Sequence, residues 1–172
     1  MSRREKLTIE LKEDIGAAIL ELMQEKSFDK ITVDELTKKA DVGRVTFYRQ
    51  FKSKQEAIAF KLERDWEKYG EEKNLNFETT PPQEFAEAFF EFFYSLKDIN
   101  DLLIKNDLRS CILDAMRIAF KNIENTENKK EYYREHFLAY GLLGLVDGWI
   151  DAGYDLSIKK ISKIALETFY KV

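Results

Sequence analysis

Apolar residues recur three and four positions apart through most of the chain, which is the spacing of one buried face on a helix. The pattern predicts helices over residues 9–26, 53–70, 108–123, 130–152 and 157–170, and two short helices between Ile31 and Phe51. It also predicts an aromatic-rich helix that follows an N-cap at Thr80, and a short turn of helix within residues 98–106. We therefore expect an all-α protein of about nine helices, with a three-helix head at its N-terminus and a larger helical bundle behind it.

The two short helices have the signals of a helix-turn-helix. Thr32 and Glu35 have the spacing of a capping box, in which each side chain satisfies a free backbone donor at a helix start. Residues 41–43 break the pattern, and Gly43 is expected to supply backbone angles that other residues avoid. Phe47 and Phe51 then share one face of the second helix. Two helices joined by a turn of about three residues are typical of DNA-reading modules.

Another capping box, Ser53 with Glu56, starts the helix that follows the head. We therefore place a helix-turn-helix domain at residues 1–52 and a helical domain for ligand binding and dimerisation at residues 53–172.

The head resembles the tetracycline-repressor (TetR) family of transcriptional regulators. The resemblance rests on Thr32, Leu36, residues 40–43, residues 46–51 and Lys54, and it covers about the first third of the chain. Three positions depart from the family pattern: Asp41 replaces Gly, Gly43 replaces Ser, and Thr37 replaces Ala. The resemblance implies a homodimeric DNA-binding regulator, a repressor of a palindromic operator that a small-molecule effector releases.

The candidate DNA contacts lie on the second helix and at the helix starts around it. They are Thr32, Gly43, Arg44, Val45, Thr46, Tyr48, Arg49 and Lys54. Arginine can bind guanine through two hydrogen bonds, and Thr and Val methyl groups can contact the thymine methyl. The resemblance implies that Thr32, Tyr48 and Lys54 hold the DNA backbone, while residues 44–46 face the bases.

The charge distribution fits this assignment, although the net charge of the chain is −4. Residues 1–54 hold 12 basic and 10 acidic side chains, a net charge of +2. Residues 36–54 alone hold six basic side chains and one acidic side chain. Residues 1–8 are expected to form a polar tail, with a basic arm that contacts phosphate as the alternative.

The aromatic-rich helix has two interpretations. Aromatic residues at helical spacing are typical of a core, whereas the family resemblance implies an apolar effector pocket in this bundle. The candidate pocket residues are Trp66, Phe85, Phe89, Phe92, Phe93, Met116 and Phe120.

The last two predicted helices carry more apolar surface than a small bundle needs, which favours a homodimer interface. The candidate residues are Gly141, Gly144, Leu145, Gly148, Trp149, Ile158, Ile161, Ala165 and Phe169. The glycines permit close approach of a helix, either from a second copy or from residues 157–170 of the same chain.

No motif indicates an enzyme, a cofactor or a metal site. Cys111 and His136 are single residues on separate helices, which favours packing or surface roles. The one cysteine and the lack of an apolar leader or a bilayer-long apolar run predict a cytoplasmic protein that does not enter membranes. Two alternatives stay open: a ligand-independent or protein-partnered regulator, and a helical interaction or lipid-binding module that does not bind DNA.

Overall fold

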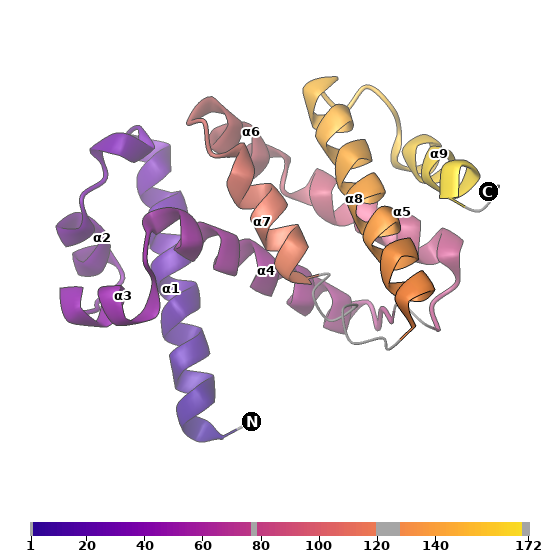
Figure 1. The fold of residues 1–172 in the computed structure, drawn as a ribbon. Coiled ribbons are helices and arrows are strands. Elements are labelled where there is room, and N and C mark those ends of the chain that lie inside the picture. Colours follow the sequence, from indigo (N-terminus) through magenta and orange to yellow (C-terminus); the bar gives the residue numbers. More distant parts are fainter. Residues whose placement is uncertain (1, 77–78, 120–127, 170–172) are drawn as a thin grey trace. The chain divides into compact units, whose positions relative to one another are not determined.

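The computed structural model describes residues 2–76, 79–119 and 128–169 (Figure 1). These residues form nine α-helices and one 3-10 turn, and none of them lies in a strand. The helices are α1 (Arg3–Glu25), α2 (Val33–Lys39), α3 (Arg44–Gln50), α4 (Lys54–Glu72), α5 (Pro82–Ser95), α6 (Lys97–Lys105), α7 (Arg109–Ala119), α8 (Lys129–Asp151) and α9 (Ile158–Phe169), with the turn η1 (Phe28–Lys30) between α1 and α2. The prediction of an all-α chain with about nine helices is confirmed.

The chain folds into two compact units. The first contains the residues up to 65 together with 98–115, and the second contains 66–97 together with the residues from 116 onward. The first unit therefore includes the first part of α4, all but the first residue of α6 and much of α7 in addition to the head. The functional division after residue 52 stays a prediction.

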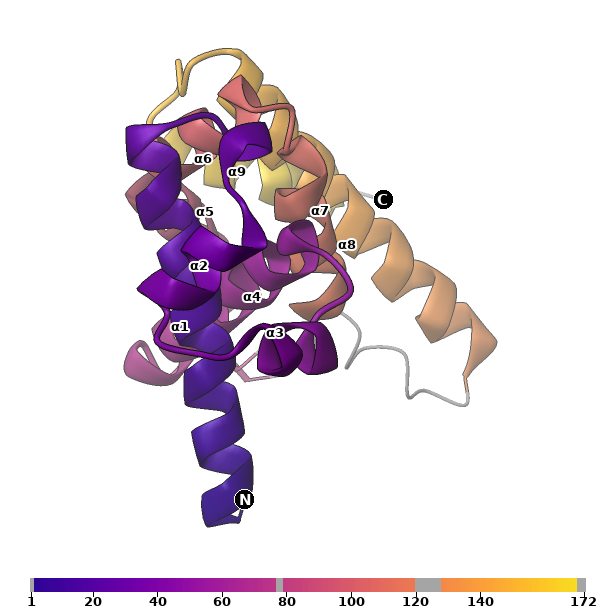
Figure 2. The same ribbon diagram turned by 90° about the vertical axis from the view of Figure 1, so that its left-hand side faces the viewer.

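In the first unit, α2 and α3 lie side by side on one flank of α1 (Figure 1 and Figure 2). Their apolar faces are buried together, as the periodicity predicted. The side chains with almost no exposed surface in this core are Ile15, Ile19, Leu36, Phe47 and Ile58. The opposite faces of α2 and α3 are exposed.

A close helix crossing fixes α4 against α1 inside this unit. Gly16 is buried in the middle of α1. A Cβ atom built on it would lie 2.5 Å from the Cβ of Lys61 and 2.7 Å from the carbonyl oxygen of Ala57, both on α4. No side chain larger than hydrogen fits at this crossing without a shift of backbone.

The first helix begins earlier than the sequence analysis expected. Residues 3–8 belong to α1 instead of forming a tail. Ser2 and Glu5 make a capping box: the Glu5 amide donates to Ser2 Oγ, and the Ser2 amide donates to the Glu5 carboxylate. This Ser-x-x-Glu spacing was visible in the sequence, and it explains why the polar segment is helical.

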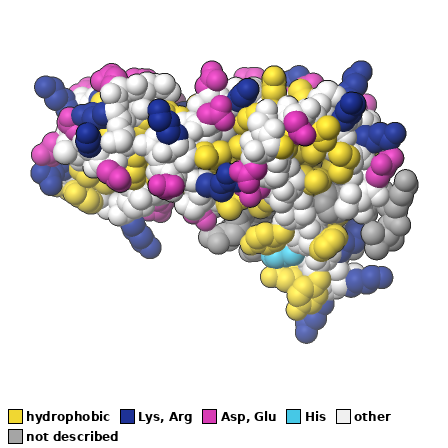
Figure 3. All heavy atoms as spheres, turned by 90° about the horizontal axis from the view of Figure 1, so that it is seen from above, with side chains coloured by type: hydrophobic (Ala, Val, Ile, Leu, Met, Phe, Trp, Pro, Cys, Tyr) yellow, Lys and Arg dark blue, Asp and Glu magenta, His cyan; other side chains and the backbone are white. Residues whose placement is uncertain are grey.

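In the second unit, α9 packs closely on α5 and also contacts α8. The core between them is aromatic: the ring of Trp149 lies edge-on to that of Phe90 at 5.7 Å, and its indole nitrogen donates to the Leu156 carbonyl. Hydrophobic side chains also gather on the surface around the single histidine of the chain, which lies on α8 (Figure 3). None of the described helices is long and apolar enough to cross a bilayer.

Candidate nucleic-acid interface

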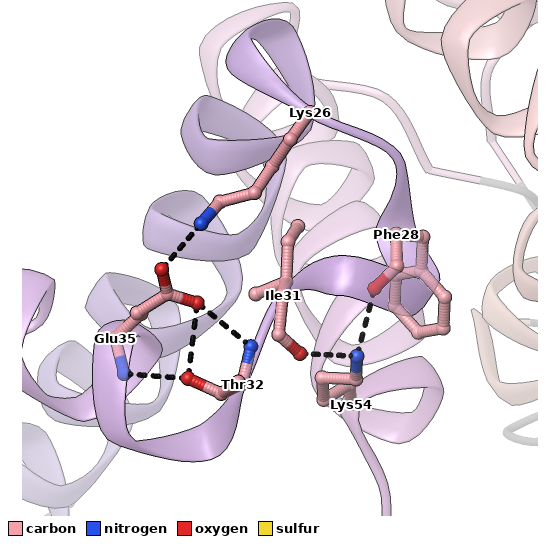
Figure 4. A network of polar contacts seen from close by, with 6 residues as sticks. All are labelled: Lys26, Phe28, Ile31, Thr32, Glu35 and Lys54. Atoms are coloured by element: carbon pink, nitrogen blue, oxygen red, sulfur yellow. Dashed lines mark hydrogen bonds and ion pairs between the residues drawn. The ribbon is translucent and has the colours of Figure 1, made fainter.

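The start of α2 is a complete capping box. The Glu35 amide donates to Thr32 Oγ1 at 3.2 Å, and the Glu35 carboxylate accepts from the Thr32 amide and hydroxyl at 3.0 Å (Figure 4). The Lys26 ammonium pairs with the other carboxylate oxygen. The hydrogen bonds from Lys26 and Thr32 lower the pKa of Glu35 to about 2. The Thr32 hydroxyl is thus engaged in the cap, and its predicted contact with the DNA backbone stays a prediction.

The turn between α2 and α3 is a Schellman motif. The Val42 amide donates to the Thr37 carbonyl at 2.9 Å, and the Asp41 amide donates to the Lys38 carbonyl at 3.4 Å. Asp41 adopts the left-handed conformation, with φ of 52°. Gly43, which the sequence analysis expected to supply unusual angles, has φ of −78° and is an ordinary extended N-cap. That expectation was wrong, because the turn needs its left-handed residue directly after the C-cap of α2, where the TetR pattern has glycine.

Two phenylalanines orient α3. Phe47 and Phe51 are buried, so the faces on either side of them turn outward. Val45 is 80% exposed, Arg44, Tyr48 and Arg49 are exposed, and Thr46 is half-buried. The helix therefore presents an outer face that combines two guanidinium groups with apolar and hydroxyl-bearing side chains. We call Arg44, Val45, Tyr48 and Arg49 the outer face of α3.

An ion pair joins the two helices of the motif at their N-termini. Arg44 Nη1 lies 2.9 Å from Asp34 Oδ1, and both side chains are largely exposed. Asp34 is in the first turn of α2, and Arg44 is the first residue of α3. Sequence reasoning missed Asp34, because the two residues are ten positions apart and only the turn brings them together.

Lys54 has a different role from the phosphate contact expected for it. Its ammonium donates to the carbonyl oxygens of Phe28 at 2.9 Å and Ile31 at 2.7 Å, and it lies 4.0 Å from the centre of the Phe28 ring (Figure 4). Burial lowers the pKa of this ammonium. Lys54 thus ties the start of α4 to the turn η1, and its phosphate contact remains a prediction for the DNA-bound state.

Three other cations near the motif carry exposed charge. Among the residues that the structure describes, Lys38, Arg49 and Lys52 have no ion-pair or hydrogen-bonding partner for their side chains. Lys39 is instead paired with Glu21 at 2.9 Å, which raises the pKa of the lysine. Lys38 and Lys52 are two of the six basic residues in 36–54, and their exposed ammonium groups can contact phosphates.

The candidate pocket residues form one ring cluster as far as the structure describes them. The ring of Trp66 lies within 5.2–6.2 Å of the rings of Phe85, Phe89 and Phe92, and the ring of Phe93 is 5.0 Å from that of Phe89. Met116 is buried, and Phe120 lies outside the described residues.

The candidate interface residues divide between the surface and the core. Gly144 and Gly148 are exposed, with no atom within 4 Å of a built Cβ, so helix α9 of the same chain does not pack on them. Gly141, Leu145 and Ile158 are half-buried, and Trp149, Ile161 and Ala165 are buried. These last three belong to the core: Trp149 of α8 packs against Phe90 of α5, and Ile161 and Ala165 are buried where α9 packs on α5. The side chain of Phe169 is not described.

Cys111 lies on α7 and His136 lies on α8. Burial is the main cause that raises the pKa of the Cys111 thiol to about 11, so the thiol is protonated at neutral pH. His136 Nδ1 lies 3.0 Å from the Tyr132 carbonyl, and its ring lies 4.1 Å from that of Tyr132.

Comparison with known protein families gives one match over the head. Residues 15–58 match the family model of "Bacterial regulatory proteins, tetR family". The matched segment runs from the middle of α1 to the start of α4 and includes the whole motif with the outer face of α3. A comparison with curated proteins found no match.

Proposed function

We propose that this chain is a homodimeric repressor of a palindromic operator. The family-model match over its head supports a DNA-binding transcriptional regulator of the TetR family. The outer face of α3 is the observation that carries the proposal. In a helix-turn-helix protein, the second helix lies in the major groove with its N-terminal residues on the base edges. Arg44 and Val45 occupy that part of α3, so we assign them to base contacts. Tyr48, Arg49 and the unpaired Lys38 and Lys52 are assigned to the phosphates.

The dimer is proposed from the exposed side of α8. Tyr133 is 69% exposed, Phe137 is 64% exposed, and Tyr140 is also exposed. Farther along the same helix lie Gly144 and Gly148, which are exposed and have no atom within 4 Å of a built Cβ. A run of large aromatic side chains on the surface of a single chain is a mark of an interaction site. A second copy of the chain is the proposed partner.

An antiparallel pairing of two α8 helices accounts for the order of residues on this side. A two-fold axis near residues 142 and 143 would set Phe137 opposite Gly148 of the partner subunit and Gly141 opposite Gly144 of the partner subunit. Large rings would then lie over positions without side chains, as close helix packing requires. The same symmetry would present two copies of α3 to two half-sites, so the operator is expected to be palindromic.

Gly144→Leu tests this arrangement. Because no atom lies within 4 Å of a Cβ at Gly144, the leucine fits the isolated chain and blocks only the approach of a second helix. We expect light scattering to give the mass of a dimer for the wild type and 20.3 kDa for the variant, with unchanged helicity by circular dichroism. A wild-type monomer at micromolar concentration would overturn the dimer, and so would a variant that dimerises normally.

Release by an effector is proposed from the ring cluster at the end of α4. Tyr69, like Trp66, extends from α4 toward Phe92, and its ring lies 5.4 Å from that of Phe92. The Tyr69 hydroxyl donates to Glu91 at 3.2 Å, and burial is the main cause that raises its pKa to about 12. An apolar small molecule that inserts between these rings would move the end of α4. It would release DNA only if it binds the DNA-free conformation more tightly.

A ligand-independent or protein-partnered regulator is the second candidate, and one observation favours it. Trp66 and Phe92 are 5.2 Å apart, and Phe89 and Phe93 are 5.0 Å apart, which are distances of rings already packed together. Titration of 1-naphthol into the protein–operator complex separates the two candidates by fluorescence anisotropy. Release of the operator supports the effector, and unchanged binding up to the solubility limit supports the filled core.

The proposed function itself is tested by enrichment of bound sequences from random DNA. We expect one palindromic site with its half-sites about one helical turn, or a multiple of a turn, apart. Recovery of no preferred sequence would overturn the proposal. It would favour an interaction or lipid-binding module in which the helix-turn-helix is only part of the scaffold.

A further inference from the structure

The N-terminus of α3 lacks the negative partners that a helix start normally has. No acidic residue lies in its first turn, and the N-cap Gly43 provides no side-chain hydrogen bond. Its first residue is instead Arg44, whose positive charge is unfavourable beside the positive end of the helix dipole. The negative charge comes from α2, because the Asp34 carboxylate lies 2.9 Å from Arg44 Nη1.

We propose that Asp34 is a positioning residue that determines sequence specificity by holding Arg44 for base contact. This inference rests on the proposed function, since it assigns a partner to the arginine of the DNA-reading helix. Arg44 Nη1 is ion-paired with Asp34, and the N–H donors on the other guanidinium nitrogens remain for the two acceptors of a guanine. The side chain is thus held in place before DNA arrives, which lowers the ordering cost of the specific contact.

The same carboxylate weakens binding to DNA of arbitrary sequence. Non-specific affinity comes from cations that replace the counterions of the phosphates. An Arg44 paired with Asp34 adds no net charge at the groove, and the carboxylate repels any phosphate that approaches it. Asp34 therefore opposes phosphate contacts while it supports base contacts, and its effect appears in the ratio of the two affinities.

Asp34→Asn removes the charge and keeps the size of the side chain. We expect its affinity for random DNA to rise, with a salt slope steeper by about 0.9, and its ratio of operator to random affinity to fall about tenfold, which is within the range of one bidentate base contact. Glu21→Gln is the matched control, because Glu21 of α1 pairs with Lys39 of α2 at the same distance of 2.9 Å, so this ion pair includes no residue of α3. We expect this control to keep the wild-type ratio.

A second background separates positioning from a general effect on the fold. In Arg44→Ala protein, Asp34→Asn is expected to leave the ratio unchanged, since there is no guanidinium to hold. A purely structural role would weaken operator and random DNA together and would persist without Arg44. Circular dichroism melting checks that each variant is folded.

Each outcome identifies which claim fails. If the wild type enriches no preferred site, the proposed function fails and this inference fails with it. If a site is enriched and Asp34→Asn keeps the wild-type ratio, only this inference is overturned. It is also overturned if the ratio falls equally with and without Arg44. The inference is supported if Asp34→Asn lowers the ratio of operator to random affinity only in protein that retains Arg44, and if Glu21→Gln leaves this ratio unchanged.

Discussion

Gly16 is the position at which the smallest possible substitution should have a large effect. Gly16→Ala adds one methyl group to the crossing of α1 and α4, at 2.5 Å from the Lys61 Cβ and 2.7 Å from the Ala57 carbonyl oxygen. Ordinary contacts of a Cβ are longer than 3.4 Å, so the two helices must separate. The Ala57 oxygen belongs to the helix backbone and cannot rotate away.

The expected magnitude is the difference between two opposing effects. Because the obstructing Ala57 oxygen is backbone, overpacking should cost about 2–3 kcal/mol, the upper part of the usual range, while alanine in a helix interior gains about 1 kcal/mol over glycine. We therefore expect Gly16→Ala to lower the free energy of unfolding by about 1–2 kcal/mol. In a chain of this size that lowers Tm by about 2–8 °C.

Gly70→Ala is the matched control, because Gly70 is also helical and nothing lies within 4 Å of a Cβ built on it. It should raise the free energy of unfolding by up to about 1 kcal/mol, through helix propensity alone. Urea unfolding of both variants at equal protein concentration measures the difference. If Gly16→Ala were as stable as the wild type, or were stabilised like Gly70→Ala, the close crossing would be refuted.

Three further predictions concern the head. Asp41→Gly should raise the free energy of unfolding by about 1 kcal/mol, since φ of 52° suits glycine; a lower denaturation midpoint would contradict the left-handed turn. Lys54→Met should lower the free energy of unfolding by about 1–3 kcal/mol, because the carbonyls of Phe28 and Ile31 lose a charged donor. A free energy of unfolding equal to that of the wild type would contradict the link between Lys54 and η1. The folded-state pKa of Glu35 lies below its unfolded value of 4.5, so its contribution is present above pH 4.5 and is lost as pH falls toward about 2. Melting of Glu35→Gln should therefore depend less on pH in this window than melting of the wild type, and parallel curves would contradict the capping network.

Local signals in the sequence predicted much of the head. The capping box of Thr32 and Glu35 and the buried pair Phe47 and Phe51 act between neighbours on one helix, so spacing alone reveals them. The Ser2 and Glu5 box was equally local, but the polar composition around it suggested a tail. Charge density is thus a poor guide to fraying where a cap is present.

Contacts between elements could not be predicted in the same way. The Asp34–Arg44 pair and the bonds from Lys54 to η1 depend on how the turns place separate elements. The apolar stripe on α9 was correctly identified, but periodicity does not say whether a stripe faces its own chain or another. Close packing on α5 puts Ile161 and Ala165 in the core and leaves the exposed side of α8 as the proposed interface.

The outer face of α3 is proposed to lie against the bases of an operator. A photo-reactive phenylalanine analogue placed at Val45, which is 80% exposed, tests it directly on the enriched operator. The control carries the same analogue at Leu113 on α7, an exposed apolar position in the first unit. We predict irradiation to link position 45 to bases inside each half-site, while position 113 gives no link. Crosslinking from position 113 with none from position 45, while the operator is bound with full affinity, would contradict the placement of α3 against the bases.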